Sequence, residues 1–290
     1  MLEEFGEIVK RQEPLAPYTY FKVGGPAEFL AQPRSVEELA ALLRKCLQEK
    51  IPMRMLGGGR NVLVPDEGVR GLVLRLAEPA FTHISVEAHH IRAGAGAHLS
   101  DLIGQAARAG LAGLETLVGI PGSVGGAVRC NTGDRSGDIG QFVRHLEVLD
   151  SSGNRQVRER DEMHFDDQGC NLDDPILLAV DLELDSDQPD AIHKRMLKAW
   201  IHRKASQPLS SQAAGRMFRN PRGVTAGKLI EQSGLAKTRV GGAEISERDG
   251  NFFIVHPGAS ARDVRRLIDL ARSRVKEKFN VELELEIGMW

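Results

Sequence analysis

Nine residues near the middle of the chain decide its fold: Gly119-Ile120-Pro121-Gly122-Ser123-Val124-Gly125-Gly126-Ala127. Glycines tolerate positive φ angles and let a ligand approach the backbone with no side chain in between. Successive N–H groups in such a turn form a concave site for an anion such as a diphosphate. A single loop of this kind is most often an ordinary tight turn, so it gains weight only if similar loops occur elsewhere in the chain.

Two further glycine clusters lie nearer the N-terminus. They are Val23-Gly24-Gly25-Pro26-Ala27 and Gly57-Gly58-Gly59-Arg60-Asn61, each close to a predicted strand. Three such loops in one half of the chain favour a bound dinucleotide. None has the Gly-x-Gly-x-x-Gly spacing that opens a Rossmann helix, so a nicotinamide-binding fold of that kind is not indicated.

The composition is that of an ordinary globular protein, with 290 residues, 41% hydrophobic and 27% charged. A formal charge of -2 argues against nucleic acid as a partner. No apolar run approaches the roughly 20 residues that span a bilayer, and the acidic start Met1–Phe5 is unlike a secretory signal. Cys46, Cys130 and Cys170 show no metal-ligand spacing. We therefore expect a cytoplasmic protein with reduced thiols, no metal and no membrane partner.

Hydrophobic periodicity predicts a mixture of helices and strands without a strict βαβ repeat, which favours the α+β class. Helices are expected over 35–48, 98–108, 190–204, 226–233 and 260–279. Strands are expected over 27–31, 53–56, 72–76, 84–86, 90–93, 145–149, 176–184, 252–255 and 282–286. A chain of this length exceeds the usual size of one core, and we predict three parts over residues 1–79, 80–188 and 189–290.

The glycine clusters belong to longer motifs. Tyr18–Ala27, Leu56–Val64 and Gly119–Ala127 resemble the flavin half of the UDP-N-acetylenolpyruvoylglucosamine reductase family. The C-terminal half is similar to that family in the order and spacing of its motifs: Phe218-Arg219-Asn220-Pro221, Ala226–Glu231, Gly234-Leu235, Val240–Ala243 and Ile245–Glu247. The resemblance covers nearly the whole chain. It implies two α+β subdomains that clasp FAD, of the vanillyl-alcohol-oxidase type, and a C-terminal α+β domain for the sugar nucleotide.

The resemblance also implies ligands and binding residues. FAD is the expected cofactor and NADPH the co-substrate, with a UDP-sugar as the small-molecule substrate. Asn220 and Asn251 lie at substrate-contacting positions. The short loop Asn131–Arg135 is like that of the family's shorter members, for which a monomer is expected. The implied cofactor-binding residues are Gly24, Gly25, Gly57, Gly58, Gly59, Arg60, Asn61, Gly119, Ile120, Pro121, Gly122, Ser123, Gly125, Gly126 and Ala127.

The catalytic positions depart from the family pattern. Leu283–Glu286 matches the terminal motif and makes Glu286 the implied catalytic glutamate, but the family's Ser or Cys proton donor is replaced by Arg216. The family's stabilising Arg falls on Gln168, and Arg60 stands where a Ser is usual. Because arginine stays protonated, Arg216 is a poor general acid. We expect it instead to supply the cation lost at Gln168. The proton would then come from a water or from a nearby side chain, for which Cys170 and Ser210 are candidates although neither occupies the family position.

Three functions remain open at this point. The first is the family's reaction, the NADPH-dependent reduction of UDP-N-acetylglucosamine enolpyruvate to UDP-N-acetylmuramate for peptidoglycan. The second is a degenerate member that binds FAD, with or without a UDP-sugar, and acts as a sensor or interaction partner without catalysis. The third is an oxidoreductase for another substrate. Loss of a general acid typically costs about 10²–10⁴ in rate, so the three differ in measurable turnover.

Overall fold

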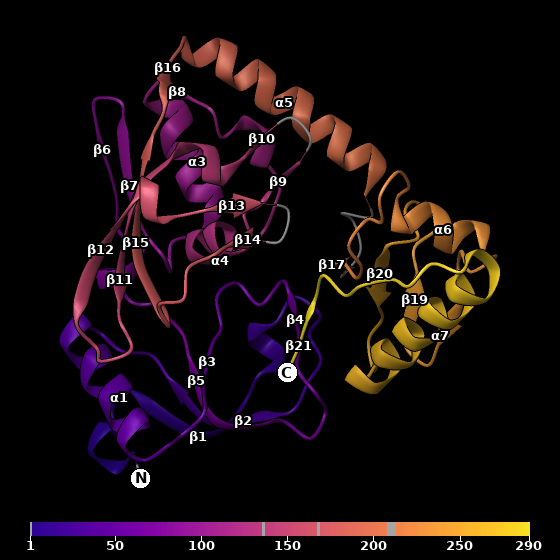
Figure 1. Ribbon diagram of the computed structural model, residues 1–290, viewed down its shortest axis with the longest axis horizontal. Coiled ribbons are helices and arrows are strands. Elements are labelled where there is room, and N and C mark those ends of the chain that lie inside the picture. The colour runs from indigo at the N-terminus through magenta and orange to yellow at the C-terminus, as the bar shows by residue number, and fades with distance from the viewer. Residues whose placement is uncertain (1, 135–136, 167–168, 208–212) are drawn as a thin grey trace. The chain divides into compact units, whose positions relative to one another are not determined.

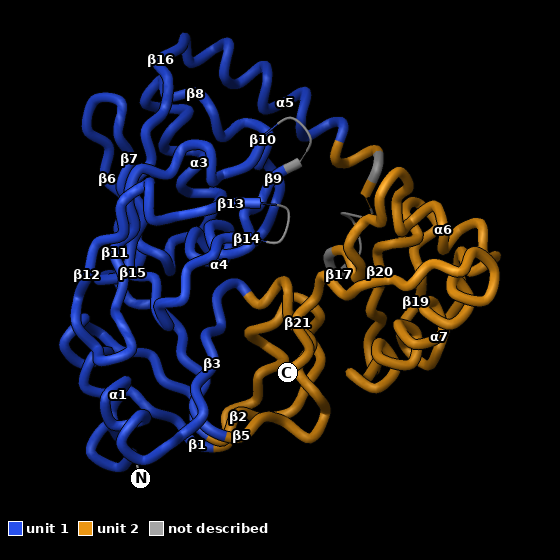
Figure 2. Tube along the Cα trace, viewed as in Figure 1, with its two compact units in different colours: residues 1–11, 29–58, 71–202 blue, residues 12–28, 59–70, 203–290 orange. Residues whose placement is uncertain are grey.

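The computed structural model describes residues 2–134, 137–166, 169–207 and 213–290, and Figure 1 shows the order of its elements. The chain forms two compact units (Figure 2). Unit 1 contains residues 1–11, 29–58 and 71–202, and unit 2 contains residues 12–28, 59–70 and 203–290. Each unit therefore joins segments that are far apart in the sequence. The expected division at residues 79 and 188 stays a prediction.

Helix and strand are mixed along the chain, and the α+β class is confirmed. The helices are α1 (Val36–Gln48), α2 (Pro79–Thr82), α3 (Leu99–Arg108), α4 (Val124–Arg129), α5 (Pro189–Ser206), α6 (Ala226–Gln232) and α7 (Ala261–Phe279). One four-stranded sheet has the order β1 (Val9–Pro14), β2 (Pro26–Ala31), β5 (Val69–Leu74) and β3 (Met53–Met55).

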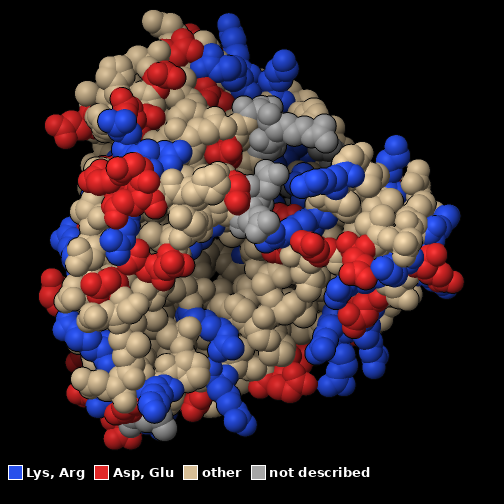
Figure 3. Space-filling view, viewed as in Figure 1, with Lys and Arg blue, Asp and Glu red and all other residues tan. Residues whose placement is uncertain are grey.

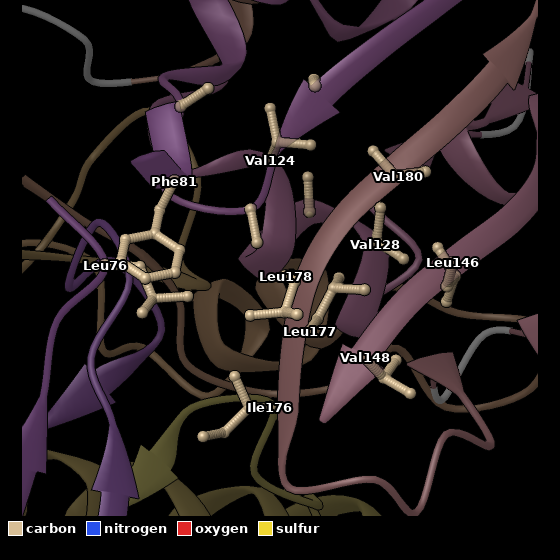
Figure 4. Close-up of a cluster of buried hydrophobic side chains, with 14 of the residues drawn as sticks. Leu76, Phe81, Val124, Val128, Leu146, Val148, Ile176, Leu177, Leu178 and Val180 are labelled. Atoms are coloured by element: carbon tan, nitrogen blue, oxygen red, sulfur yellow. The ribbon is translucent and has the colours of Figure 1, made fainter. Parts of the chain in front are cut away.

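The largest sheet of unit 1 has five antiparallel strands. Their order is β12 (Arg155–Glu159), β11 (Val143–Leu149), β15 (Ile176–Glu183), β7 (His90–Gly94) and β6 (Ile84–Glu87). Helices α3 and α4 pack beside this sheet (Figure 1). Val124 and Val128 of α4 point toward Leu178 and Val180 of β15 in a buried apolar cluster (Figure 4). That cluster anchors α4 and, with it, the glycine-rich loop that precedes the helix.

Short strand pairs complete unit 1. They are β16 (Asp185–Ser186) with β8 (Leu111–Ala112), β10 (Gly137–Asp138) with β9 (Gly133–Asp134), and β13 (Phe165–Asp166) with β14 (Gly169–Cys170). Helix α1 starts where its sequence predicts, since the Ser35 side chain accepts a hydrogen bond from the Glu38 N–H. Its face of Leu39, Leu42 and Leu43 is buried in the unit 1 core.

Unit 2 is built on an antiparallel sheet covered by helices. The strand order is β17 (Ala213–Arg216), β20 (Phe252–Val255), β19 (Ala243–Ile245) and β18 (Arg239–Val240). Helix α7 packs on β18 and β19, and α6 packs on α7. Ser260 and Asp263 form a capping box at the start of α7. Asp66 adds to it by accepting hydrogen bonds from the N–H groups of Ala261 (2.8 Å) and Arg262 (3.0 Å).

The segment over 282–286, predicted as a strand, forms none. It makes a single bridge, between Leu285 and Phe218, and the short strand β21 (Gly288–Met289) pairs in parallel with β4 (Val62–Leu63) just beyond it. Its alternating pattern is real, since Leu283 and Ile287 are buried and Glu284 and Glu286 are exposed. The segment is extended, but only Leu285 bridges to Phe218, and the chain then pairs with β4 through β21. No regular ladder forms over 282–286.

Charged side chains of both signs are interspersed on the face shown in Figure 3. This fits the formal charge of -2. In the described part of the chain, no helix is long and apolar enough to cross a membrane.

Candidate flavin and catalytic sites

Two glycine loops of unit 1 lie directly against each other. A Cβ atom added to Gly58 would lie 2.6 Å from Cα of Gly122, and one added to Gly57 would lie 2.4 Å from Oγ of Ser123. Real Cβ atoms do not approach other atoms so closely, so side chains at these positions would force the loops apart. The sequence therefore brings together residues 57–58 and 122–123, which are more than 60 positions apart, because both loops carry glycine.

The same loops present backbone N–H groups that remain available to a ligand. Within the described residues, the N–H groups of Gly57, Gly58, Gly119, Gly122 and Ser123 donate no hydrogen bond to protein. Gly119 (φ 78°) and Gly122 (φ 137°) adopt backbone angles that favour glycine. A Cβ atom on Gly122 would meet no protein atom within 4 Å, so the space beside it is open. A diphosphate-bearing cofactor such as FAD fits this arrangement.

The second half of this loop seats helix α4. Ser123 caps the helix by accepting a hydrogen bond from the Gly126 N–H (3.3 Å). The N–H of Gly125 donates to the Ala95 carbonyl (2.8 Å), and a Cβ atom on Gly125 would lie 2.8 Å from Cβ of Ala95. Ile120 and Ala127 are buried, and Pro121 is half-buried. These contacts give Gly125 and Ala127 a packing role.

The glycines of the N-terminal clusters that fall in unit 2 have close backbone neighbours. A Cβ atom on Gly24 would lie 2.6 Å from Cβ of Val64, and one on Gly25 would lie 2.2 Å from the Asp66 carbonyl oxygen. The Gly25 N–H donates to the Pro65 carbonyl (2.8 Å). A Cβ atom on Gly59 (φ 64°) would lie 2.2 Å from the Tyr18 carbonyl oxygen. Packing alone thus explains these three glycines, and their cofactor contact stays a prediction.

A second group of predicted residues gathers around Glu286 in unit 2. The Asn61 side-chain Nδ2 donates to the Glu286 carbonyl (3.0 Å), and the Glu286 N–H donates to the Met217 carbonyl (2.9 Å). Residues near 60, 217 and 286 therefore lie together. This arrangement places Arg60, Arg216 and Glu286, all singled out from the sequence, in one neighbourhood.

The electrostatics of this neighbourhood are unusual. Glu286 keeps some solvent contact, but the surrounding protein desolvates its carboxyl group and raises its pKa, and the charges of Arg216, Arg60 and Arg219 partly oppose that shift. Desolvation likewise lowers the pKa of the half-buried Arg60 guanidinium, with Tyr20 and Glu286 opposing it. Arginine remains charged even so. Three cations around one carboxyl group give this neighbourhood a positive potential, which would favour an anionic ligand.

The two predicted substrate-binding asparagines differ in how far their side chains are already hydrogen-bonded within the protein. Asn251 is buried, and its side chain bonds both the N–H (2.9 Å) and the carbonyl (2.7 Å) of Phe218, so it fixes the backbone beside the cluster. Asn220 is exposed, and its Oδ1 accepts from the Ala226 N–H (3.0 Å) at the start of α6. Substrate contact by either residue stays a prediction.

The remaining catalytic candidate, Gln168, lies outside the described residues, as does Ser210. Cys170 ends the β13–β14 pair in unit 1 and is half-buried, and desolvation raises the pKa of its thiol. Sequence reasoning missed Asp249, whose carboxylate lies within electrostatic reach of Arg216. No local motif marks it, because Asp249 and Arg216 lie on different segments of the chain, which are joined by the pairing of β17 with β20.

Comparison with known proteins first defines the class. Residues 27–157 match the FAD binding domain model, and residues 207–290 match the model of the UDP-N-acetylenolpyruvoylglucosamine reductase C-terminal domain. A cholesterol oxidase from B. sterolicum, at 16% identity and a TM-score of 0.50 over 62% of this chain and 38% of that chain, shares the fold alone. The chain is therefore a flavoprotein-type α+β protein, and the FAD-binding fold expected from the sequence is confirmed.

Relatives then identify the family. The UDP-N-acetylenolpyruvoylglucosamine reductase of Moorella thermoacetica is 43% identical over 97% of this chain and 93% of its own length. That of Rhodopirellula baltica is 33% identical over 99% of this chain and 94% of its own. The crystal structure of the Thermus caldophilus reductase matches with a TM-score of 0.84 and 39% identity, covering 97% of this chain and 98% of that chain. The chain belongs to the UDP-N-acetylenolpyruvoylglucosamine reductase family.

Proposed function

We propose that this protein is an FAD-dependent reductase that converts UDP-N-acetylglucosamine enolpyruvate to UDP-N-acetylmuramate with NADPH, a step in peptidoglycan precursor synthesis. One observation carries the proposal: the paired glycine loops at 57–58 and 122–123 expose unbonded N–H groups in the FAD binding domain of a reductase-family chain. FAD, when bound, supplies the hydride chemistry. The protein's own residues must hold the cofactor, bind the UDP-sugar and manage charge and protons.

The cofactor-holding residues in this proposal fall into two groups. The N–H groups of Gly57, Gly58, Gly119, Gly122 and Ser123 bind the diphosphate of FAD. The second group is made of the remaining residues of the three glycine motifs, which line the rest of the cofactor site: Gly24, Gly25, Gly59, Arg60, Asn61, Ile120, Pro121, Gly125, Gly126 and Ala127.

The catalytic proposal centres on Arg216 and Glu286. Reduction of the enolpyruvyl group leaves negative charge on the substrate carbon and carboxylate, and the Arg216 guanidinium is the cation that stabilises it, in place of the family Arg that is Gln168 here. A preorganised charge of this kind contributes about 10²–10³ in rate. Asn220 and Asn251 position the sugar nucleotide. The protein acts in the cytoplasm as a monomer, with parts 1–79, 80–188 and 189–290 as its three domains.

An anaerobic stopped-flow measurement in two steps tests the function. NADPH should bleach the flavin absorbance of the purified protein, and adding UDP-N-acetylglucosamine enolpyruvate should restore it. Bleaching without recovery would mean that the protein no longer reduces this substrate. A second assay with other enolpyruvyl and enoyl compounds would then separate a degenerate binder from a reductase of another substrate.

A further inference from the structure

The C-terminal segment changes its neighbour in the fold at Glu286. Before this point it lies beside the chain that follows β17: Leu285 forms a bridge with Phe218, and the Glu286 N–H donates to the Met217 carbonyl (2.9 Å). From Gly288 onward, the segment forms β21 and pairs in parallel with β4 (Figure 1). Residue 286 therefore lies where the segment passes from one neighbour to the other.

Asn61, directly before β4, bonds the C-terminal segment on both sides of this passage. Its side-chain Nδ2 donates to the Glu286 carbonyl (3.0 Å), and its main-chain carbonyl accepts from the Gly288 N–H (3.0 Å). The residue between these two, Ile287, is buried in the unit 2 core. One residue of the second glycine cluster thus holds residues 286–288 at both ends, and all of these residues belong to unit 2.

The main chain of Glu286 is therefore held from two directions. Its N–H is bonded to the Met217 carbonyl, and its carbonyl is bonded to the Asn61 side chain. The main-chain conformation of a residue sets the direction of its Cα–Cβ bond, although the carboxyl group of a glutamate keeps its own side-chain torsions. Loss of the Asn61 amide would remove one of these two restraints on residue 286.

We propose that Asn61 is a positioning residue for Glu286, and that its side-chain amide holds the main chain of that residue in place for turnover. The inference deepens the proposed function and rests on it for the role in turnover. It is separate from the cofactor contact proposed for Asn61, because the bond to residue 286 is made within the protein and needs no ligand.

Asn61→Asp in the full-length protein is the direct test. The change keeps the size and the main-chain groups of the residue. It replaces the amide donor by a carboxylate oxygen, which can only accept a hydrogen bond and therefore repels the Glu286 carbonyl. Amide hydrogen exchange over residues 284–290, measured by mass spectrometry in the protein as purified and with FAD added, should quicken about fivefold. Exchange as slow as in the wild type would overturn the proposal.

Two further variants show whether the amide donor itself matters. Asn61→Gln keeps such a donor on a longer side chain and should recover part of the protection, whereas a loss equal to that of Asn61→Asp would refute the proposal. Asn280→Asp is the matched control, because it makes the same chemical change at an exposed position of the C-terminal segment. Asn280 adopts the left-handed conformation that ends α7 (φ 54°), and its variant should keep exchange over 284–290 and kcat within about twofold of the wild type. An equal effect of this control would indicate a general charge effect and refute the positioning role.

Turnover per bound flavin supplies the second arm. Asn61→Asp should lower kcat about tenfold with little change in KM, because a small error in the position of a reacting group is costly. In a Glu286→Gln background it should have almost no further effect, and effects that simply multiply would overturn the proposal. Loss of bound flavin with normal kcat and normal exchange would also overturn it, and would make Asn61 a cofactor ligand only. If the wild-type protein shows no turnover at all, the proposed function fails, while hydrogen exchange still decides whether Asn61 holds residue 286.

Discussion

At the scale of single residues, Gly58 shows how tightly the two flavin loops are packed. Gly58→Ala would place a Cβ atom 2.6 Å from Cα of Gly122, and backbone cannot yield as a flexible side chain can. We expect a clear loss of bound FAD, measured as the ratio of flavin absorbance to protein absorbance after purification.

Gly104→Ala is the matched control for that substitution. Gly104 lies inside α3, and its new Cβ atom would make only an ordinary contact, 3.5 Å from Arg108 Nη1. It should keep its full flavin content and gain about 0.5–1 kcal/mol of stability, because alanine favours a helix. A Gly58→Ala protein as yellow as this control would show that the loop contact does not govern cofactor binding.

Cys46 should be the least reactive of the three thiols. It is buried in the unit 1 core, and desolvation raises its pKa to about 11. Thiolate is the reactive form, so a disulfide reagent at pH 8 should modify exposed Cys130 first and Cys46 only after unfolding. Because the folded pKa is raised, the contribution of this thiol to stability is present below pH 9 and is lost as the pH rises toward 11. Fast labelling of Cys46, located by peptide mass, would contradict this.

The residue scale also shows what sequence could and could not predict about the site. The glycine loops were found because glycine patterns are local, and Glu286 was found through a motif. The grouping of Arg60, Arg216 and Arg219 around Glu286 could not be predicted from the sequence. These residues come from distant segments, which tertiary hydrogen bonds bring together near residues 61, 217 and 286. Asp249 has no sequence signal at all.

At the scale of elements, α7 offers a clean test of capping. Ser260→Ala removes the side chain that accepts the Asp263 N–H (3.1 Å) and should cost about 1 kcal/mol in the free energy of unfolding. Ser273→Ala, an exposed position in the middle of the same helix, makes the same chemical change without a cap and should be neutral or slightly stabilising. Urea denaturation of both proteins measures the difference, and equal midpoints would contradict a capping role.

Helices were the elements most readily predicted. The expected starts at Ser35 and Ser260 are the observed caps, since an N-cap side chain and the apolar face behind it are both local features. The strand expected over 282–286 failed for the opposite reason. The alternation of apolar and charged residues shows which side of the segment faces the core. A strand also needs a neighbouring segment that pairs along its length, and here only Leu285 forms a bridge, to Phe218.

At the scale of the whole molecule, each unit has its own apolar core. Leu267→Ala in α7 should destabilise unit 2 by about 2–5 kcal/mol, because Leu267 is fully buried there. Hydrogen exchange should quicken in residues 12–28, 59–70 and 203–290 together, although they are remote in sequence.

Leu146→Ala is the corresponding change in unit 1, on β11. It should quicken exchange in residues 1–11, 29–58 and 71–202 instead. The two variants thus check each other. Identical exchange patterns in both would show that the chain unfolds as one cooperative body. Composition and periodicity could not predict the division into these two units. No local sequence feature shows that residues 12–28 and 59–70 pack with the C-terminal segment.

The interleaved course of the chain has a consequence for its synthesis. Phe21, Val23 and Leu63 belong to a core whose other members all follow residue 203. About 130 residues separate residue 70 from residue 203, so at ribosomal speeds of about 5–20 residues per second the early segments wait roughly 7 to 27 s for their partners. During that interval these side chains stay open to water and to chaperones, and a pause in translation before residue 203 lengthens their exposure.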